Sequence, residues 1–148
     1  MNNQDAKEMN ELLFSFMGLF HEKFLIRYRQ HDHDILGLKK NHFKILGMLS
    51  REEFLLSSEL SRRLDIEKGS ITTLIDQLVE KGLVIRRTDP EDRRKSQISL
   101  SKTGREEMHK LIDKHSREIQ SYLQDMNDPE IQQFLDCVRY AVQFMNKL

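Results

Sequence analysis

The stretch from Ser58 to Arg94, SELSRRLDIEKGSITTLIDQLVEKGLVIRRTDPEDRR, contains two helical patterns separated by a turn. We expect a short helix over 59–64, capped by Ser57 or Ser58, because a serine hydroxyl accepts hydrogen bonds from the free amides of a first turn. A turn follows at 65–69. The three-and-four spacing of the apolar residues in 71–79 then predicts a second helix, which Gly82 ends. The stretch therefore predicts two short helices joined by a tight turn.

The apolar period changes after Gly82. Residues 83–88 are rich in β-branched side chains, and residues 96–100 alternate polar and apolar side chains, so both segments are typical of strands. Between them, the charged segment 89–95 contains Pro90, which favours a turn. The sequence therefore predicts a β-hairpin with a charged tip.

Long helical patterns flank this region. Apolar residues at 9, 12, 13, 16, 17, 20, 24 and 28 predict a long amphipathic first helix, which residues 31–34 interrupt, and a shorter helix is predicted over 40–49. Ser101 is expected to cap a helix with apolar positions from 108 to 126. Asp128 and Pro129 are expected to start the last helix, with Asp128 as its cap. The predicted fold is mostly α with a small β-hairpin wing, which is an α+β winged helix-turn-helix.

Composition excludes several classes of protein. With 148 residues, 38% of them hydrophobic, the chain is long enough for one compact domain. Its longest apolar stretches are shorter than the roughly 18 residues of a membrane span, so no membrane partner is expected. The lone Cys137 and the absence of a signal-like start at Met1 lead us to expect a cytoplasmic protein. The sequence contains no phosphate-binding loop, nucleophile motif or metalloprotease motif, so we expect no enzyme, catalytic residue, metal site or cofactor.

The zero net charge conceals an uneven distribution. Residues 57–105 contain 11 basic and 8 acidic side chains, a net charge of +3, whereas the rest of the chain carries −3. A basic centre between acidic flanks favours a chain whose centre meets an anion.

The order of the predicted elements indicates how double-stranded DNA would be bound. In a winged helix-turn-helix, the second short helix enters the major groove and the hairpin tip reaches a neighbouring groove. Small polar side chains at the start of that helix can contact base edges and phosphates, as can Asp76 and Gln77 one turn on. The alternative for these residues is that Ser70 caps the helix and the threonines only face solvent. The candidate DNA-binding residues are Lys68, Ser70, Thr72, Thr73, Gln77, Arg86, Asp92, Arg93, Arg94 and Lys95.

Four segments, 58–64, 69–86, 89–94 and 100–104, together resemble the MarR family of transcriptional regulators. The resemblance implies a homodimer that binds a pseudo-palindromic operator and regulates a nearby gene, usually as a repressor. It also implies that Arg94 is the family's minor-groove arginine and that Asp92 orients it. A narrow minor groove attracts an inserted guanidinium, which agrees with this role. The chain departs from the family pattern at Thr73, where many members carry arginine, and at His42, where the family has glutamine.

The apolar helices at both ends of the chain predict a dimerisation region over 5–30 and 102–148, beside a DNA-binding region over 36–100. The last helix carries a second apolar stripe, so it requires partners on two sides. Packing these helices between two subunits would place two recognition helices on one duplex. An internal core that uses every stripe is the alternative. The candidate dimerisation residues are Leu12, Leu13, Phe16, Phe20, Phe134, Val138, Val142 and Met145.

The sequence leaves the effector open. Resemblance to the family implies a small ligand that modulates DNA binding. A redox-responsive variant would use Cys137, and a metal-responsive one would use His31, His33, His42 and His109. A winged-helix module that binds protein is the alternative of another class, since the net charge is zero.

Overall fold

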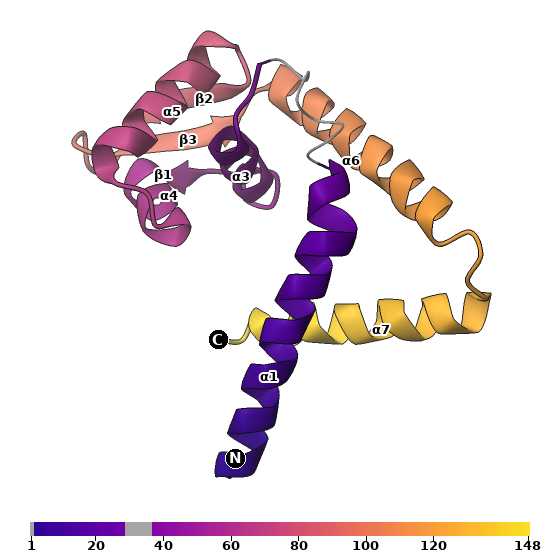
Figure 1. Ribbon diagram of the computed structural model, residues 1–148. Helices are drawn as coiled ribbons and strands as arrows, with labels where there is room; N and C mark the ends of the chain where they lie inside the picture. The colour runs from indigo at the N-terminus through magenta and orange to yellow at the C-terminus, as the bar shows by residue number, and fades with distance from the viewer. Residues whose placement is uncertain (1, 29–36) are drawn as a thin grey trace. The chain divides into compact units, whose positions relative to one another are not determined.

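The computed structural model describes residues 2–28 and 37–148. The chain divides into two compact units, Met1–Met108 and His109–Leu148. Figure 1 shows the winged part, in which α3, α4 and α5 gather around a small sheet, and the long helices α1, α6 and α7. The interruption that the sequence predicts at 31–34 lies outside the described residues.

The winged part follows the predicted order of elements. Helix α3 (Lys40–Leu49) precedes strand β1 (Leu55–Leu56), and helices α4 (Ser57–Leu64) and α5 (Lys68–Glu80) follow it. Strands β2 (Val84–Thr88) and β3 (Ser96–Leu100) form the predicted hairpin, which is confirmed. The antiparallel sheet has the order β1-β3-β2, so β3 is central.

The core of the winged part contains the apolar faces that the period predicts. Helix α5 buries Ile71, Ile75 and Leu78, whereas Leu74, which shares the predicted face, is only half-buried. The fully buried large side chains are Ile45, Leu49, Leu60, Ile71, Ile75, Leu78, Leu83, Ile98 and Leu100. Because these residues face the core, the opposite face of α5 is the one available to an external partner.

Several predicted helix caps are wrong by one to three residues. Helix α4 begins at Ser57, and the Glu59 carboxylate, from inside the first turn, accepts the Leu56 N–H at 2.8 Å. Helix α5 begins at Lys68, so Ser70 lies within its first turn and the alternative interpretation of Ser70 as a cap is wrong. In α7 (Asp128–Met145), Asn127 rather than Asp128 is the cap and accepts the Glu130 N–H. Asp128 is a suitable cap residue, but Asn127 caps α7 in its place, whereas no side chain caps the first turns of α4 and α5.

The start of α6 (Lys102–Tyr122) is anchored to the corner between α5 and β2. As predicted, Ser101 is a cap: its Oγ accepts the Gly104 N–H and donates to the Gly82 carbonyl. Gly82 has φ +69°, which agrees with its predicted role as the glycine that ends α5. A Cβ at Gly104 would lie 2.0 Å from the Leu83 carbonyl oxygen, so this close approach of two backbones requires glycine.

The first helix contains a wider turn. Helix α1 (Asn3–Phe20) continues into the π-helical turn η1 (His21–Leu25), where the Ile26 N–H donates to the His21 carbonyl five residues earlier, and residues 26–28 are again α-helical. Four aromatic rings follow one another along this element, with centroids 5.5 to 6.5 Å apart: Phe16, Phe20, Phe24 and Tyr28. Among the described residues, no helix is both long and apolar enough to cross a membrane.

Candidate nucleic-acid interface

The face of α5 opposite the core is polar and exposed. Lys68, Ser70, Thr72 and Thr73, all candidate DNA contacts, are exposed at the start of the helix. The hydroxyls of Thr72 and Thr73 donate to carbonyls four residues earlier, at Lys68 and Gly69. Each hydroxyl oxygen therefore retains lone pairs, and on these exposed residues it can accept a bond from a base amino group.

Gln77 is positioned differently from the other candidates on α5. Its side chain is half-buried, and its Oε1 lies 2.8 Å from Nε2 of the buried His42 in α3. Because Oε1 is already bonded to His42, the candidate contact of Gln77 with DNA is limited to its side-chain NH2 group. The amide oxygen links two helices of the protein.

Arg86 on β2 forms an ion pair with α5. Its Nη2 lies 2.6 Å from Oδ1 of Asp76, and the Arg86 side chain is only 35% exposed. The pair ties the base of the hairpin to α5. As the protein stands, much of the Arg86 charge is satisfied by Asp76.

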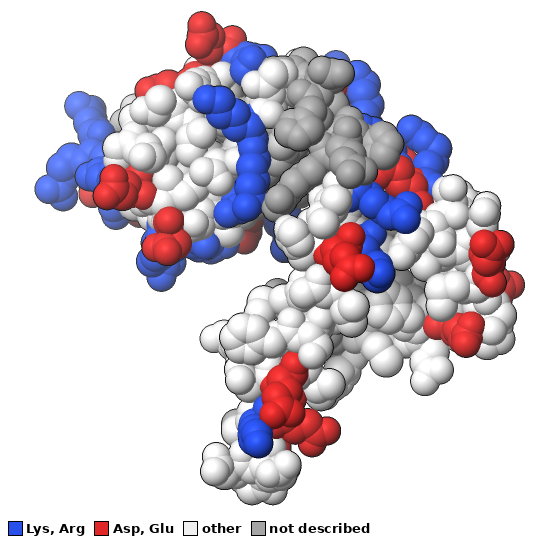
Figure 2. Space-filling model, in the orientation of Figure 1, with Lys and Arg blue, Asp and Glu red and all other residues white. Residues whose placement is uncertain are grey.

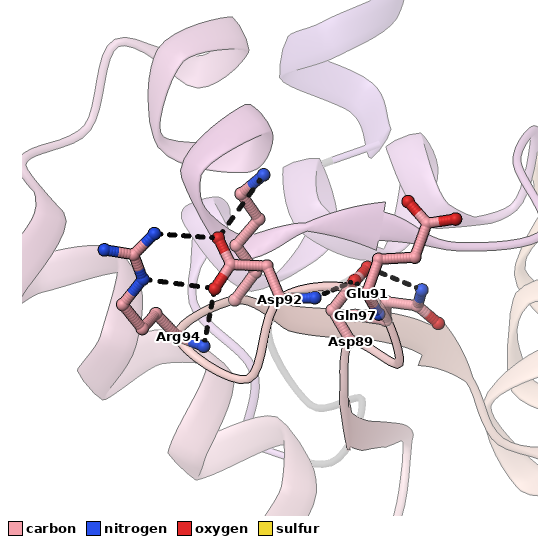
Figure 3. A network of polar contacts seen from close by, with 6 residues as sticks. Asp89, Glu91, Asp92, Arg94 and Gln97 are labelled. Carbon is pink, nitrogen blue, oxygen red and sulfur yellow. Dashed lines mark hydrogen bonds and ion pairs between the residues drawn. The ribbon is translucent and has the colours of Figure 1, made fainter.

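The hairpin turn is built around the Asp89 carboxylate (Figure 3). Its Oδ1 accepts the backbone N–H groups of Glu91 and Asp92, and its Oδ2 accepts the Gln97 side-chain amide at 2.9 Å. The Gln97 amide first, and then the two backbone N–H groups, hold the pKa of Asp89 below its usual range. Asp89 therefore remains ionised and fixes the shape of the turn.

A second carboxylate of the turn, Asp92, holds two of the three cations at the tip (Figure 3). Asp92 Oδ1 accepts from Nε of Arg94 at 3.2 Å and from the Arg94 backbone N–H, and Asp92 Oδ2 lies 3.7 Å from Nζ of Lys95. The Arg94 guanidinium, as the largest cause, lowers the pKa of Asp92. The Arg94 side chain is nonetheless 91% exposed, so it is oriented and still available to a partner.

The surface charge agrees with this geometry. Figure 2 shows Lys and Arg side chains projecting at the left edge of the winged part, where Figure 1 places the β2–β3 turn. Arg93, Arg94 and Lys95 are all exposed there. The turn therefore presents a positive tip to solvent.

Sequence reasoning missed three parts of this arrangement. It did not identify Asp89 and Gln97 as the pair that shapes the turn, although an aspartate before proline is a common signal for such a turn. It also did not identify the pairing of Asp76 with Arg86 or of Gln77 with His42. In these two pairs the partners lie 10 and 35 positions apart in the chain, and no local pattern joins them.

Comparisons with known proteins agree with the fold and the site. The sequence model described as MarR family matches residues 36–95. The chain is 26% identical to a MarR family protein from Bacillus stearothermophilus, whose structure matches with a TM-score of 0.74 over 99% of each chain. It is also 30% identical over 104 residues to the HTH-type transcriptional regulator SarZ from Staphylococcus haemolyticus, covering 68% of this chain and 67% of SarZ. The chain belongs to the MarR family.

A further relative of this MarR-family chain is named a repressor. The HTH-type transcriptional repressor YetL from Bacillus subtilis is 33% identical over 101 residues, which is 67% of this chain. The chain spans about three fifths of YetL's length, 60%. The family and these relatives are transcriptional regulators and not enzymes, as the sequence predicts.

The candidate dimerisation residues lie on the long helices. Seven of the eight are exposed within the single chain, and Val138 is half-buried. The exposed fractions of the residues reach 63% at Leu12 in α1 and 60% at Met145 in α7. Both helices therefore present large apolar side chains to solvent.

The candidate sensing residues show no built site in the part of the chain that the structure describes. There, no three His, Cys, Asp or Glu side chains are grouped so that they could hold a metal ion. His31 and His33 lie outside the described residues. Cys137 is an exposed free thiol, and His42 is engaged with Gln77.

Proposed function

We propose that this MarR-family chain is a sequence-specific transcriptional regulator, acting as a homodimeric repressor on a pseudo-palindromic operator in double-stranded DNA. The observation that carries the proposal is Arg94 at the hairpin tip. Asp92 orients its guanidinium, while the side chain is 91% exposed. An oriented, exposed arginine on a projecting turn suits insertion into the negative potential of a narrow minor groove.

The other candidate residues divide into two roles. Ser70, Thr72 and Thr73 on the exposed face of α5 would contact base edges in the major groove. Lys68, Arg93 and Lys95 would contact phosphates, which position the protein without reading sequence. Asp92 would act indirectly, by positioning Arg94 and Lys95. Arg86 and Gln77 would contact DNA only when Asp76 and His42, their partners within the protein, release them.

Dimer formation would pair two such surfaces. The large apolar side chains of α1 and α7 would pack against the same helices of a second chain, in a closed two-fold arrangement. Two recognition helices would then meet half-sites about 10 base pairs apart, or a multiple of that. This division assigns residues 5–30 and 102–148 to dimerisation and 36–100 to DNA binding.

We further propose that a small ligand modulates DNA binding, as the resemblance to the family implies. A metal ion and an oxidant acting on Cys137 are the competing effectors. Once the operator is known, small aromatic acids, divalent metals and peroxide can each be tested for release of bound DNA. Release by one class only would assign the effector.

The first experiment is selection of bound fragments from the source genome at about 0.1 to 0.15 M salt. We expect a pseudo-palindromic sequence near the gene of the protein itself. The Arg94→Ala variant should bind that DNA about tenfold or more weakly and should lower the salt dependence by about one counterion per subunit, which is about two for the dimer. Arg117→Ala, which removes an exposed arginine from α6, is the matched control and should bind normally.

Two results would contradict the proposal. Normal operator binding by Arg94→Ala would remove the hairpin tip from the interface. Failure to enrich any DNA, with or without the effectors above, would favour a winged domain that binds protein.

A further inference from the structure

His42 is the one buried polar or charged residue among those described, with 2% of its surface exposed. It lies in the first turn of α3, and both of its ring nitrogens have partners. The Lys39 backbone N–H donates to Nδ1 at 3.0 Å, and Nε2 lies 2.8 Å from Gln77 Oε1 on α5. One imidazole thus joins the start of α3 to the recognition helix.

The two partners determine which nitrogen carries the proton. A backbone N–H can only donate, so Nδ1 must be the unprotonated acceptor. Nε2 must then carry the hydrogen, which it donates to the Gln77 carbonyl oxygen. The geometry is satisfied by a single neutral tautomer.

Protonation of the ring is incompatible with this arrangement. A second hydrogen, on Nδ1, would face the Lys39 N–H, and two donors would then oppose each other. Among the described residues, the charged groups that act on His42 are Lys39, before α3, and Lys81, at the end of α5, and both are positive. Burial is the largest cause that lowers the pKa of His42, the two lysines lower it further, and the Gln77 hydrogen bond opposes them.

Gln77 lies on the same face of α5 as Thr73, one helical turn earlier. Apolar packing of Ile71, Ile75 and Leu78 holds α5 to the core but is not directional. The hydrogen bond from His42 is directional and fixes how α5 is seated about its own axis. Loss of this bond would misplace Thr73 and Ser70 relative to base edges.

We propose that neutral His42 is a positioning residue that seats the recognition helix α5 against α3, and that protonation of its ring unseats α5 and weakens DNA binding. This proposal rests on the proposed function, since it concerns regulation of the same DNA-binding surface.

The experiment combines two measurements on the full chain. Histidine ring signals and amide hydrogen exchange of α5 are followed by NMR from pH 7.5 to pH 5 without DNA. Affinity for the selected operator fragment is measured over the same range at constant ionic strength. We expect His42 to titrate below 6.5, the value of a free histidine, and the protection of α5 amides, taken relative to their intrinsic exchange rate at each pH, to fall as it does so.

Three variants isolate His42. His42→Asn keeps an acceptor near Lys39 but has no titrating ring and does not reach Gln77. The His42→Asn variant should bind DNA weakly at every pH. Between pH 7.5 and pH 5, the affinity of the wild type should therefore fall by about tenfold more than that of the variant, which corresponds to the loss of one buried hydrogen bond. Gln77→Glu should move the His42 titration and the loss of α5 protection to higher pH, because a carboxylate favours imidazolium. His109→Asn, at an exposed position on α6, should keep the wild-type profile.

The outcomes distinguish this proposal from the proposed function. Equal pH profiles of affinity in wild type and His42→Asn, or α5 exchange that ignores the His42 titration, would overturn the positioning role alone. Wild-type protein that binds no DNA at any pH would overturn both.

Discussion

Two carboxylates determine how exposed two candidate DNA-binding arginines are. Asp92 orients Arg94 and leaves it 91% exposed, whereas Asp76 holds Arg86 at 2.6 Å with its side chain 35% exposed. An ion pair with aspartate therefore leaves the Arg94 side chain exposed to solvent but partly covers and neutralises Arg86. Arg94 is available for a groove, and Arg86 is committed to the joint between β2 and α5.

Asp76→Ala should release Arg86 toward the DNA backbone. We expect stronger binding to random-sequence DNA and a salt dependence steeper by about one counterion per subunit, since one more cation in each subunit can meet a phosphate. Fluorescence anisotropy over a series of salt concentrations measures both. Asp113→Ala removes one exposed negative charge from α6 and is the control; an unchanged slope in Asp76→Ala would mean that Arg86 makes no phosphate contact even when unpaired.

At the scale of elements, hydrogen bonds and a close backbone approach join the end of α5 to the start of α6. Ser101 Oγ donates to the Gly82 carbonyl and accepts the Gly104 N–H, and the Ser101 N–H donates to Leu83. These bonds bring the first turn of α6 against the backbone at Leu83. There is no room for a side chain at Gly104.

Gly104→Ala should therefore destabilise the protein. The added Cβ would meet the Leu83 carbonyl oxygen at 2.0 Å, so the backbone must shift, at a cost of about 1–3 kcal/mol in the free energy of unfolding. Chemical denaturation monitored by circular dichroism measures the loss. Gly47→Ala in α3 is the control, because nothing lies within 4 Å of its added Cβ and alanine stabilises a helix by about 0.5–1 kcal/mol. Equal stability of Gly104→Ala and wild type would contradict the close approach.

The elements themselves were largely predictable from the sequence. The change of apolar period after Gly82 located the hairpin, and the helix over 40–49 was predicted with its observed bounds. Strand β1 was not predicted, because two residues are too few to show a period. The start of α7 was misplaced by one residue because Asn127 and Asp128 are both good caps, and Asn127 accepts the Glu130 N–H. Helix α4 begins at Ser57 without a side-chain cap, so a capping serine could not locate its start.

The candidate site was predictable only in part. The pairing of Asp92 with Arg94 came from resemblance to the family, and the structure places these side chains in contact. The bond between His42 and Gln77 joins residues 35 positions apart, and it exists only once α3 and α5 have packed. Contacts of that kind follow from tertiary packing and not from local pattern.

At the scale of the whole molecule, the exposed apolar faces of α1 and α7 make a testable case for a homodimer. Phe16→Glu and Phe134→Glu each place a charge on side chains that are 51% and 50% exposed in the single chain. Burying that charge between subunits is costly, so both variants should sediment as monomers and lose operator binding. Asn10→Glu adds the same charge at an exposed polar position of α1 and should leave the dimer intact. A monomeric wild-type protein would refute the dimer.

The π-helical turn η1 changes the direction in which side chains project from the first helix. Side chains four residues apart on a regular α-helix drift by about 40° at each step, because four residues overshoot one turn. A row of rings at 16, 20, 24 and 28 would therefore wind around the helix, and the wider turn at His21–Leu25 takes up part of this drift. Deleting one residue there would turn the helix before the deletion by about 100° relative to the helix after it. The length of this short segment, more than the identity of its residues, determines which side of α1 continues the aromatic row.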